Sequence, residues 1–417
     1  MQIKTILNRV QKFKSFVYGE VSWVENTSVP TLEVEIRPRL NSGPICSGCG
    51  RKQPGYDSLP ERRFEFIPTW GCKMFFVYKP RRVDCSRCGI HVEQMPWVVG
   101  KRRLTEAYAW YLAGWAKRLS WKEVAEAFHT TWDHVFCSVE RAVNWGREHQ
   151  DLSGVKAIGV DEIAWKRGHR YLTLVYQIDE YNKRLLWIGE KRKAKTLLRF
   201  FRWFGKERSQ ALRFVCSDMW KAYLKVIAKK AGNALNILDR FHIMTHLSKA
   251  IDEVRAQEVR ELKEQGYEPV LTKTRWLLLK KPENLTETQG SKLADLLQYN
   301  FRSIRSYLLK EEFQLFWQYT SPYWADVYLN KWCTKTMRSK IEPMKKVARM
   351  LRRHQPLLMN WFKAKKQFSS GIVEGFNTKA KLTTRKAYGF RTYHAAEIAL
   401  YHALGALPVP ETAHKFF

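Results

Sequence analysis

The spacing of hydrophobic residues changes along the chain and divides it into regions. Residues 14–40 alternate apolar and polar side chains in places, as in 32–36 (Leu-Glu-Val-Glu-Ile), which is typical of strands with one buried face. Between 105 and 149 three short helical patterns follow one another, and from 155 to 240 strand and helix patterns alternate. The sequence therefore predicts a β-rich region, a helical region and a mixed α/β region, in that order.

The α/β region can be resolved into single elements. We predict strands over 157–161, 171–176, 184–188, 214–216 and 235–238, and helices over 194–204 and 220–230. From about 240 to 366 the pattern is helical and interrupted by prolines, and a last helix is predicted over 372–382. Three strands followed by alternating helices and strands, βββαβαβ, indicate a mixed α/β domain with a long helical segment.

The chain is strongly basic, with 73 Lys and Arg against 40 Asp and Glu and a formal net charge of +33. A positive field of this size attracts polyanions, of which nucleic acid is the commonest, so a neutral metabolic enzyme is not the default interpretation. No apolar run approaches the roughly 18 residues that span a bilayer. We therefore expect a cytoplasmic, nucleic-acid-binding protein with no membrane partner.

The positive charge is concentrated in one segment. Residues 331–391 contain 17 Lys and Arg but only two acids, Glu342 and Glu374. A solvated helix face is the ordinary explanation of such a run. With so few acids, however, these residues would repel one another unless an anion lay against them, and we expect a nucleic-acid backbone there.

Four of the eight cysteines form two Cys-x-x-Cys pairs, each followed by a glycine that relieves the turning backbone: Cys46, Cys49 and Gly50, then Cys85, Cys88 and Gly89. Two such pairs supply the four soft ligands of a tetrahedral structural Zn²⁺ site. A redox dithiol is the alternative for a single pair and is less favoured for two in one small region. The remaining cysteines lack such spacing and are expected to be core thiols: Cys72, Cys137, Cys216 and Cys333.

The helical region has the pattern of a helix-turn-helix. Ser120 and Glu123 form a capping box, which predicts a helix start, and a turn at 129–131 precedes a third helix. The side of that helix opposite its apolar residues carries three side chains suited to base or phosphate contacts: Arg141, Asn144 and Arg147. An ordinary three-helix packing element is the alternative interpretation.

Three separated acids are candidates for a catalytic metal site. Asp161 lies near the end of one apolar strand and Asp218 follows another, while Glu374 begins the last helix. Two strand-end aspartates and a glutamate from a distant helix can hold two Mg²⁺ or Mn²⁺ ions for phosphoryl transfer. Strand alternation sends Glu162 to the opposite face from Asp161, so Glu162 is expected to lie away from the site.

Basic and aromatic residues near Glu374 are candidate DNA contacts. Asn377, Lys381 and Arg385 follow Glu374 along one helix face and would form a track for phosphates. Trp324 and Trp332 could stack on unpaired bases, although tryptophans on helices more often belong to a core.

Several segments together resemble a known family: residues 158–162 (Ile-Gly-Val-Asp-Glu), 216–220 (Cys-Ser-Asp-Met-Trp), 239–242 (Asp-Arg-Phe-His), 371–382 (Gly-Ile-Val-Glu-Gly-Phe-Asn-Thr-Lys-Ala-Lys-Leu) and 385–390 (Arg-Lys-Ala-Tyr-Gly-Phe). They resemble bacterial insertion-sequence transposases of the ISL-three family, over nearly the whole chain. The resemblance implies an RNase H-like catalytic fold in which Asp161, Asp218 and Glu374 form a DDE triad. Asp239 and His242 resemble a D-x-x-H element, in which the histidine either positions the scissile phosphate or pairs with the aspartate.

The resemblance also implies a domain layout and a function. We expect a zinc-binding domain over 1–98, a helix-turn-helix domain over 101–150, and a catalytic domain over 155–400 with a helical insertion at about 259–365. The expected substrates are double-stranded terminal inverted repeats and target DNA at the nucleoid, cleaved and joined by a homodimer or higher oligomer. The alternatives are a non-catalytic zinc and helix-turn-helix regulator, and a related RNase H-like nuclease that cleaves without joining.

Overall fold

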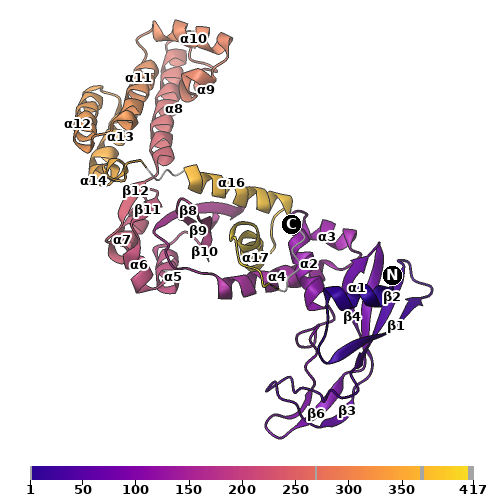
Figure 1. The fold of residues 1–417 in the computed structure, drawn as a ribbon. Coiled ribbons are helices and arrows are strands. Elements are labelled where there is room, and N and C mark those ends of the chain that lie inside the picture. The colour runs from indigo at the N-terminus through magenta and orange to yellow at the C-terminus, as the bar shows by residue number, and fades with distance from the viewer. Residues whose placement is uncertain (1, 268–269, 367–370, 412–417) are drawn as a thin grey trace. The chain divides into compact units, whose positions relative to one another are not determined.

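The structure is a computed structural model that describes residues 2–267, 270–366 and 371–411 (Figure 1). The chain forms two compact units: the residues up to Asp151 together with those from Thr383 onward, and Leu152–Leu382. The segment after 382, which we expected in the catalytic domain up to residue 400, thus groups with the N-terminal residues instead. It does so because its helix packs on a helix of that unit, as described below.

Two β-sheets build the N-terminal part of the first unit. Its elements are α1 (Ile3–Val10), β1 (Phe16–Val24), β2 (Thr31–Pro38), β3 (Gly55–Ser58), β4 (Arg62–Thr69), β5 (Cys72–Tyr78), β6 (Arg81–Cys85) and β7 (Gly89–Val92). The larger sheet has the order β1-β2-β5-β4 and the smaller one β3-β6-β7. The ring of the buried Trp97 lies between 4.9 and 6.0 Å, centroid to centroid, from four other aromatic rings of this core. The predicted β-rich character is confirmed.

The rest of the first unit is helical, with α2 (Glu106–Trp115), α3 (Trp121–Ala127), α4 (Trp132–His149) and α17 (Tyr393–Leu404). The capping box that starts α3 is formed, because the Ser120 and Glu123 side chains each accept the other's backbone N–H. His129 has a φ of 49° in the turn before α4, so the predicted turn is confirmed. Helix α4 packs against α2, α3 and α17.

The second unit is organised around a five-stranded sheet with the order β10-β9-β8-β11-β12. Its strands are β8 (Ala157–Lys166), β9 (Arg170–Ile178), β10 (Lys183–Glu190), β11 (Phe214–Ser217) and β12 (Leu235–Leu238). Strands β8, β9 and β10 are antiparallel neighbours, whereas β11 runs parallel to both β8 and β12. Every predicted strand of the α/β region is therefore present.

Helices cover both faces of this sheet. Residues of α5 (Ala194–Phe204) and α7 (Lys221–Lys230) form one hydrophobic core with Ile158 and Val160 of β8; α6 (Lys206–Ala211) connects α5 to β11. On the other face lies α16 (Gly371–Lys386), whose Val373 meets β8 at Gly159 (Figure 1). The alternation of side chains along β8 thus separates the two helical layers.

A helical segment connects β12 to α16. It comprises α8 (Arg240–Glu264), α9 (Arg275–Leu279), α10 (Glu287–Leu297), α11 (Arg302–Gln314), α12 (Pro322–Arg338), α13 (Glu342–Arg353), α14 (Gln355–Leu358) and α15 (Asn360–Lys363), with short 3₁₀ turns at Pro282–Asn284 and Leu315–Gln318. It begins at Arg240, as the helical pattern from about 240 predicted, because Asp239 caps α8 directly after β12 by accepting the N–H of Phe241 at 2.7 Å. Trp332 is buried in this segment, whereas Trp324 is exposed. None of the helices described here is both long and apolar enough to cross a membrane.

Candidate functional site

Side chains that could bind metal ions lie close together in two regions of the structure. The first region is the cysteine group. The Sγ atoms of Cys46, Cys49, Cys85 and Cys88 all lie within 4.8 Å of one another. Cys85 ends β6 and Gly89 begins β7, so a hairpin supplies the second pair of thiols. Gly50 and Gly89 have positive φ values of 72° and 79°, as the predicted turns require.

The chemistry of this group fits zinc. Hydrogen bonds from the backbone of Arg87 and Cys88, together with the neighbouring thiols, lower the pKa of Cys85, whereas burial and the neighbouring thiols raise the pKa of Cys88. One thiol of the group therefore ionises more easily at the expense of another, as expected of thiols close enough to share one metal. Cys85 and Cys46 are buried together with Val83, so the surroundings exclude water from part of the site. Four soft thiols in this arrangement are compatible with a tetrahedral Zn²⁺.

The other four cysteines do not all lie in the core. Cys216 and Cys333 are buried as predicted, but Cys72 is only partly buried and Cys137 is exposed. For Cys137 the prediction was wrong because α4 turns its neighbours inward and leaves this position on the outer side of the helix.

Asp161 is the centre of the second region. It lies in β8 and accepts a hydrogen bond from Nδ2 of Asn377 in α16 at 2.5 Å. Tyr176 of β9 donates its hydroxyl hydrogen to Oδ1 of the same Asn377 at 2.9 Å. Burial raises the pKa of Asp161 above its ordinary value, while the N–H of Glu162, which it also accepts at 2.7 Å, opposes that shift. Two neighbouring elements therefore fix the orientation of this carboxylate.

Asp218 follows β11 and is held from two sides. Its carboxylate accepts the backbone N–H of Trp220 at 2.9 Å and an N–H of the Arg192 guanidinium at 2.7 Å. Cys216 of β11 pairs with Gly159 of β8. Asp218 and Asp161 each come two residues later, so they occupy corresponding positions of the two strands. The register thus sets both predicted aspartates at corresponding positions, where the pairing of β8 with β11 ends. Strand β8 itself continues to Lys166, so Asp161 lies within its strand and not at the strand end that the sequence predicted.

The side chain of Glu162 lies on the opposite face of β8 from Asp161, but it is close to Asp218. Nε of Arg192 lies 3.0 Å from Oε1 of Glu162, so one guanidinium joins Glu162 to Asp218. Burial, and then the charge of Asp218, raise the pKa of Glu162 to about 7. The expectation that Glu162 lies outside the site is therefore wrong in part. The alternation of side chains along β8 correctly predicted the face on which Glu162 lies. It did not show that Asp218, at the end of the neighbouring strand β11, lies near Glu162.

A third aspartate lies near these two. Asp239 follows β12, and its N–H donates to the carbonyl of Ser217 at 2.9 Å. Nε2 of His242, one turn into α8, lies 3.7 Å from Oδ2 of Asp239 and 3.9 Å from Oδ1 of Asp161. His242 thus lies between Asp239 and Asp161. This position is compatible with both roles that the sequence left open, pairing with Asp239 and binding a phosphate.

Glu374 lies in the first turn of α16 and is exposed. It precedes Asn377 by three residues, which places both on the same side of the helix. Within the described residues, the four cysteines are the only group of three or more Cys, His, Asp or Glu whose ligand atoms all lie within 4.8 Å of one another. The structure therefore places Glu374 on the side of α16 that carries Asn377, but it does not close the three acids into a compact set.

The candidate DNA contacts have different surroundings. On α4, Arg141 is ion-paired with Glu106, and Arg147 lies 3.3 Å from Glu397 and stacks on Tyr401, so acids of the same unit neutralise both arginines. Asn144 is exposed. Sequence spacing could not identify these pairings, because the acids come from α2 and α17.

On α16 the predicted phosphate track is divided. Asn377 is buried against Asp161 and Tyr176 and serves the carboxylate, whereas Lys381 and Arg385 are exposed. Only the later part of the predicted track is therefore open to a ligand.

The second unit thus combines aspartates on neighbouring strands with a helix laid across the same sheet, and the first unit holds a separate four-cysteine group. The class of protein follows from the sequence comparison, which identifies a transposase. Residues 158–400 match the transposase family of the DDE, ISL-three type. The chain belongs to this family.

Named relatives extend the similarity beyond that region. The chain is 27% identical over 379 residues to the transposase for insertion sequence element IS1001 of Bordetella parapertussis, covering 90% of this chain and 92% of the relative. It is 28% identical over 386 residues to the transposase for insertion sequence element IS1557 of Mycobacterium tuberculosis, covering 86% and 85%. An alignment of 379 residues is longer than residues 158–417, so the similarity also includes part of the chain before residue 158.

Proposed function

We propose that the protein is a DNA transposase that binds the terminal inverted repeats of its insertion sequence and catalyses metal-dependent DNA cleavage and strand transfer. The observation that carries the proposal is the register that sets Asp161 and Asp218 at corresponding positions of neighbouring strands, with the Glu374 helix docked on the strand of Asp161. Three antiparallel strands continued by two parallel ones support an RNase H-like fold for this unit.

Asp161, Asp218 and Glu374 are the residues that would hold Mg²⁺ or Mn²⁺. When bound, these ions would activate water or a 3′-OH and stabilise the leaving oxygen at phosphorus. Asn377 acts as a positioning residue, because its amide directs Asp161 Oδ2 and is itself held by Tyr176. His242 lies close enough to Asp161 to donate a hydrogen bond to a phosphate oxygen beside it.

DNA recognition belongs, in this proposal, to the first unit. The four-cysteine group would hold a structural Zn²⁺ in a domain over 1–98, and the helix-turn-helix over 101–150 would read the terminal repeats. The exposed Asn144 remains available for a base contact, while Lys381, Arg385 and the other basic residues of 331–391 would hold phosphates. Joining two ends requires at least two protomers, so a homodimer or larger assembly on nucleoid DNA is part of the proposal.

The test is charge removal at each proposed ligand. Asp161→Asn, Asp218→Asn and Glu374→Gln should each lower cleavage and joining of a labelled terminal-repeat duplex at least a thousandfold in Mg²⁺, because each removes an anionic oxygen. Binding to the same duplex should stay within about twofold, because the amides keep the side-chain volume.

Glu180→Gln is the matched control, since Glu180 is exposed in the turn between β9 and β10. Glu162→Gln is unsuitable because Arg192 links Glu162 to Asp218. Near-normal strand transfer by Asp218→Asn would refute the triad. Wild-type protein that cleaves without joining would indicate a nuclease, and wild-type protein that only binds would indicate a regulator.

A further inference from the structure

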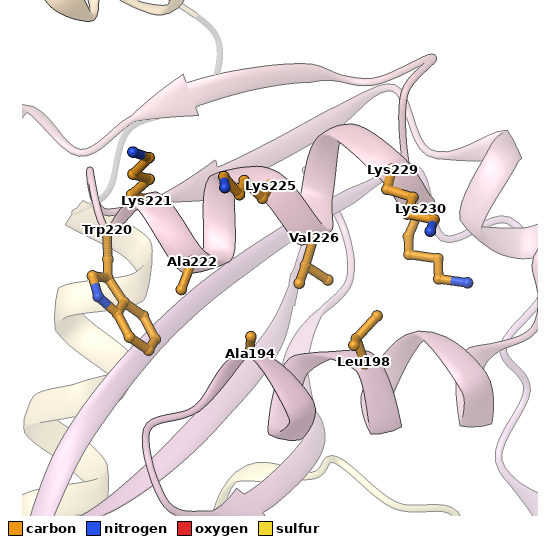
Figure 2. Close-up of a pocket in the computed structure, with 9 residues that line it drawn as sticks. All are labelled: Ala194, Leu198, Trp220, Lys221, Ala222, Lys225, Val226, Lys229 and Lys230. Atoms are coloured by element: carbon orange, nitrogen blue, oxygen red, sulfur yellow. The ribbon is translucent and has the colours of Figure 1, made fainter.

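A groove lies between α5 and α7 (Figure 2). These helices pack on the face of the sheet opposite α16. Its volume is about 710 Å³. The floor is apolar and is formed by Ala194 and Leu198 of α5 and by Ala222 and Val226 of α7. Trp220 closes one end, as the close-up shows. The groove belongs entirely to the second unit.

Lysines form the rim of this groove. Lys221, Lys225, Lys229 and Lys230 line it from α7, and all four are exposed. The first three recur every four residues, which sets them about 6 Å apart in a row along the helix. Within the described part of the chain none of the four has an acidic partner in an ion pair. The row therefore presents free positive charge to a ligand.

The sequence around the groove is also rich in basic residues, like the segment 331–391. Residues 191–230 contain 13 Lys and Arg but two acids, Glu207 and Asp218. Asp218 is already neutralised by Arg192, whereas in 331–391 several lysines and arginines are paired with acids: Lys335, Lys345, Lys346 and Arg349. None of the four groove lysines is in an ion pair of this kind within the described residues, so the charge of the groove is not neutralised by the protein itself.

The end of the groove is connected to the candidate active site. Trp220 lines the groove, and its backbone N–H donates to Asp218 Oδ1 at 2.9 Å. The Arg192 guanidinium that binds Asp218 also stacks on the Trp220 ring, 4.8 Å from its centroid. A polymer with a phosphate at Asp218 can therefore continue along the lysine row.

We propose that the α5–α7 groove is a second, sequence-independent DNA site that holds the phosphate backbone of one strand leading away from Asp218. A row of free lysines suits a regularly charged polyanion, and an apolar floor ending in a tryptophan suits sugars and bases. The proposal rests on the proposed function, since that places a phosphodiester at Asp218. It assigns DNA contacts to α7, which sequence analysis left without a role.

The salt dependence of DNA binding tests this assignment. Each lost phosphate contact should reduce the slope of log K against log salt by about 0.9. The double variant Lys225→Gln/Lys229→Gln should therefore lose about 1 to 2 in slope on a random-sequence duplex, measured by fluorescence anisotropy with the full chain. It should also bind several-fold more weakly at moderate salt. The variant should fold normally because both side chains are exposed.

The control is Lys263→Gln/Lys292→Gln, which removes the same charge from exposed positions of α8 and α10. Equal slopes and affinities for the groove variant and the control would overturn the proposal. So would an oligoglutamate peptide that binds the wild type in a groove-dependent manner while DNA binding is unaffected, because that would assign the groove to an acidic protein. Wild-type protein that binds DNA with the expected groove dependence but never cleaves it would refute the proposed function and leave the groove assignment standing.

Discussion

Replacing Gly159 by alanine should test how the third acid is placed. A Cβ at this position would lie 2.3 Å from Cγ2 of Val373 and 3.5 Å from Cγ2 of Ile178. Ordinary contact starts near 3.4 Å, so α16 or its valine must retreat by about 1 Å. Valine in a helix has one strongly preferred rotamer and cannot turn aside cheaply. Overpacking of this kind costs about 1–3 kcal/mol.

The same shift should reach the chemistry, because Glu374 is the next residue after Val373. Displacing a catalytic group by about 1 Å can cost about a hundredfold in rate. We expect Gly159→Ala to cleave a labelled terminal-repeat duplex 10- to 100-fold more slowly and to unfold at a lower temperature. End binding should be unchanged.

A double-mutant cycle separates this explanation from a general defect. Val373→Ala alone should cost about 2 kcal/mol, since two buried methyl groups are lost. Combined with Gly159→Ala it should restore part of the activity and stability, with a coupling of about 1–2 kcal/mol. Gly55→Ala is the control, because a Cβ there meets nothing within 4 Å. If Gly159→Ala behaves like Gly55→Ala, or Val373→Ala fails to relieve it, the contact does not position Glu374.

Two further predictions concern the first unit. Purified protein should contain about one Zn²⁺ per chain by metal analysis. Cys46→Ser should lose the metal and destabilise the smaller sheet, whereas the control Cys72→Ser should keep it. Metal-free wild-type protein with four freely titrating thiols would contradict this prediction. Burial, and to a lesser extent the charge of Lys117, lower the pKa of His402 from 6.5 to about 3. Because the unfolded chain binds this proton more readily, stability should be full above pH 6.5 and fall as the pH drops below it, by on the order of 1 kcal/mol at pH 5.5. His402→Gln should show a flatter decline in urea unfolding between pH 7 and 5, and a parallel decline would contradict the assignment.

Much of the α/β unit was predictable because its strands are apolar runs bounded by polar turns. The helix 194–204 and the strand 235–238 were predicted with the bounds that the structure has. The register of parallel strands was not predictable, yet it is what places Asp218 level with Asp161 and brings Asp239 beside them. Local patterns define elements, but only pairing between distant segments defines the site.

The contacts of α16 show the same limit. Nothing in the spacing of Asn377 indicated that it would bind Asp161 rather than DNA, since the partner lies 216 residues away. One signal was present: Gly159 is an isolated glycine within an apolar strand, and such a glycine often marks the close approach of another segment. Arg192 gave no comparable signal, because it belongs to a basic run that is ordinary for a solvated helix end.

The return of the chain to its first unit has a consequence for synthesis. Helix α17, which packs on α4 and supplies Glu397 to Arg147, begins about 240 residues after α4 ends. During synthesis on the ribosome, nearly all of the second unit is therefore translated after α4 and before α17, the last helix that packs on α4. Long-range closure of this kind slows folding and leaves apolar surface uncovered in the meantime. A nascent chain interrupted before α17 would thus carry α2, α3 and α4 in an incomplete core, so the order of translation itself delays the appearance of a complete first unit.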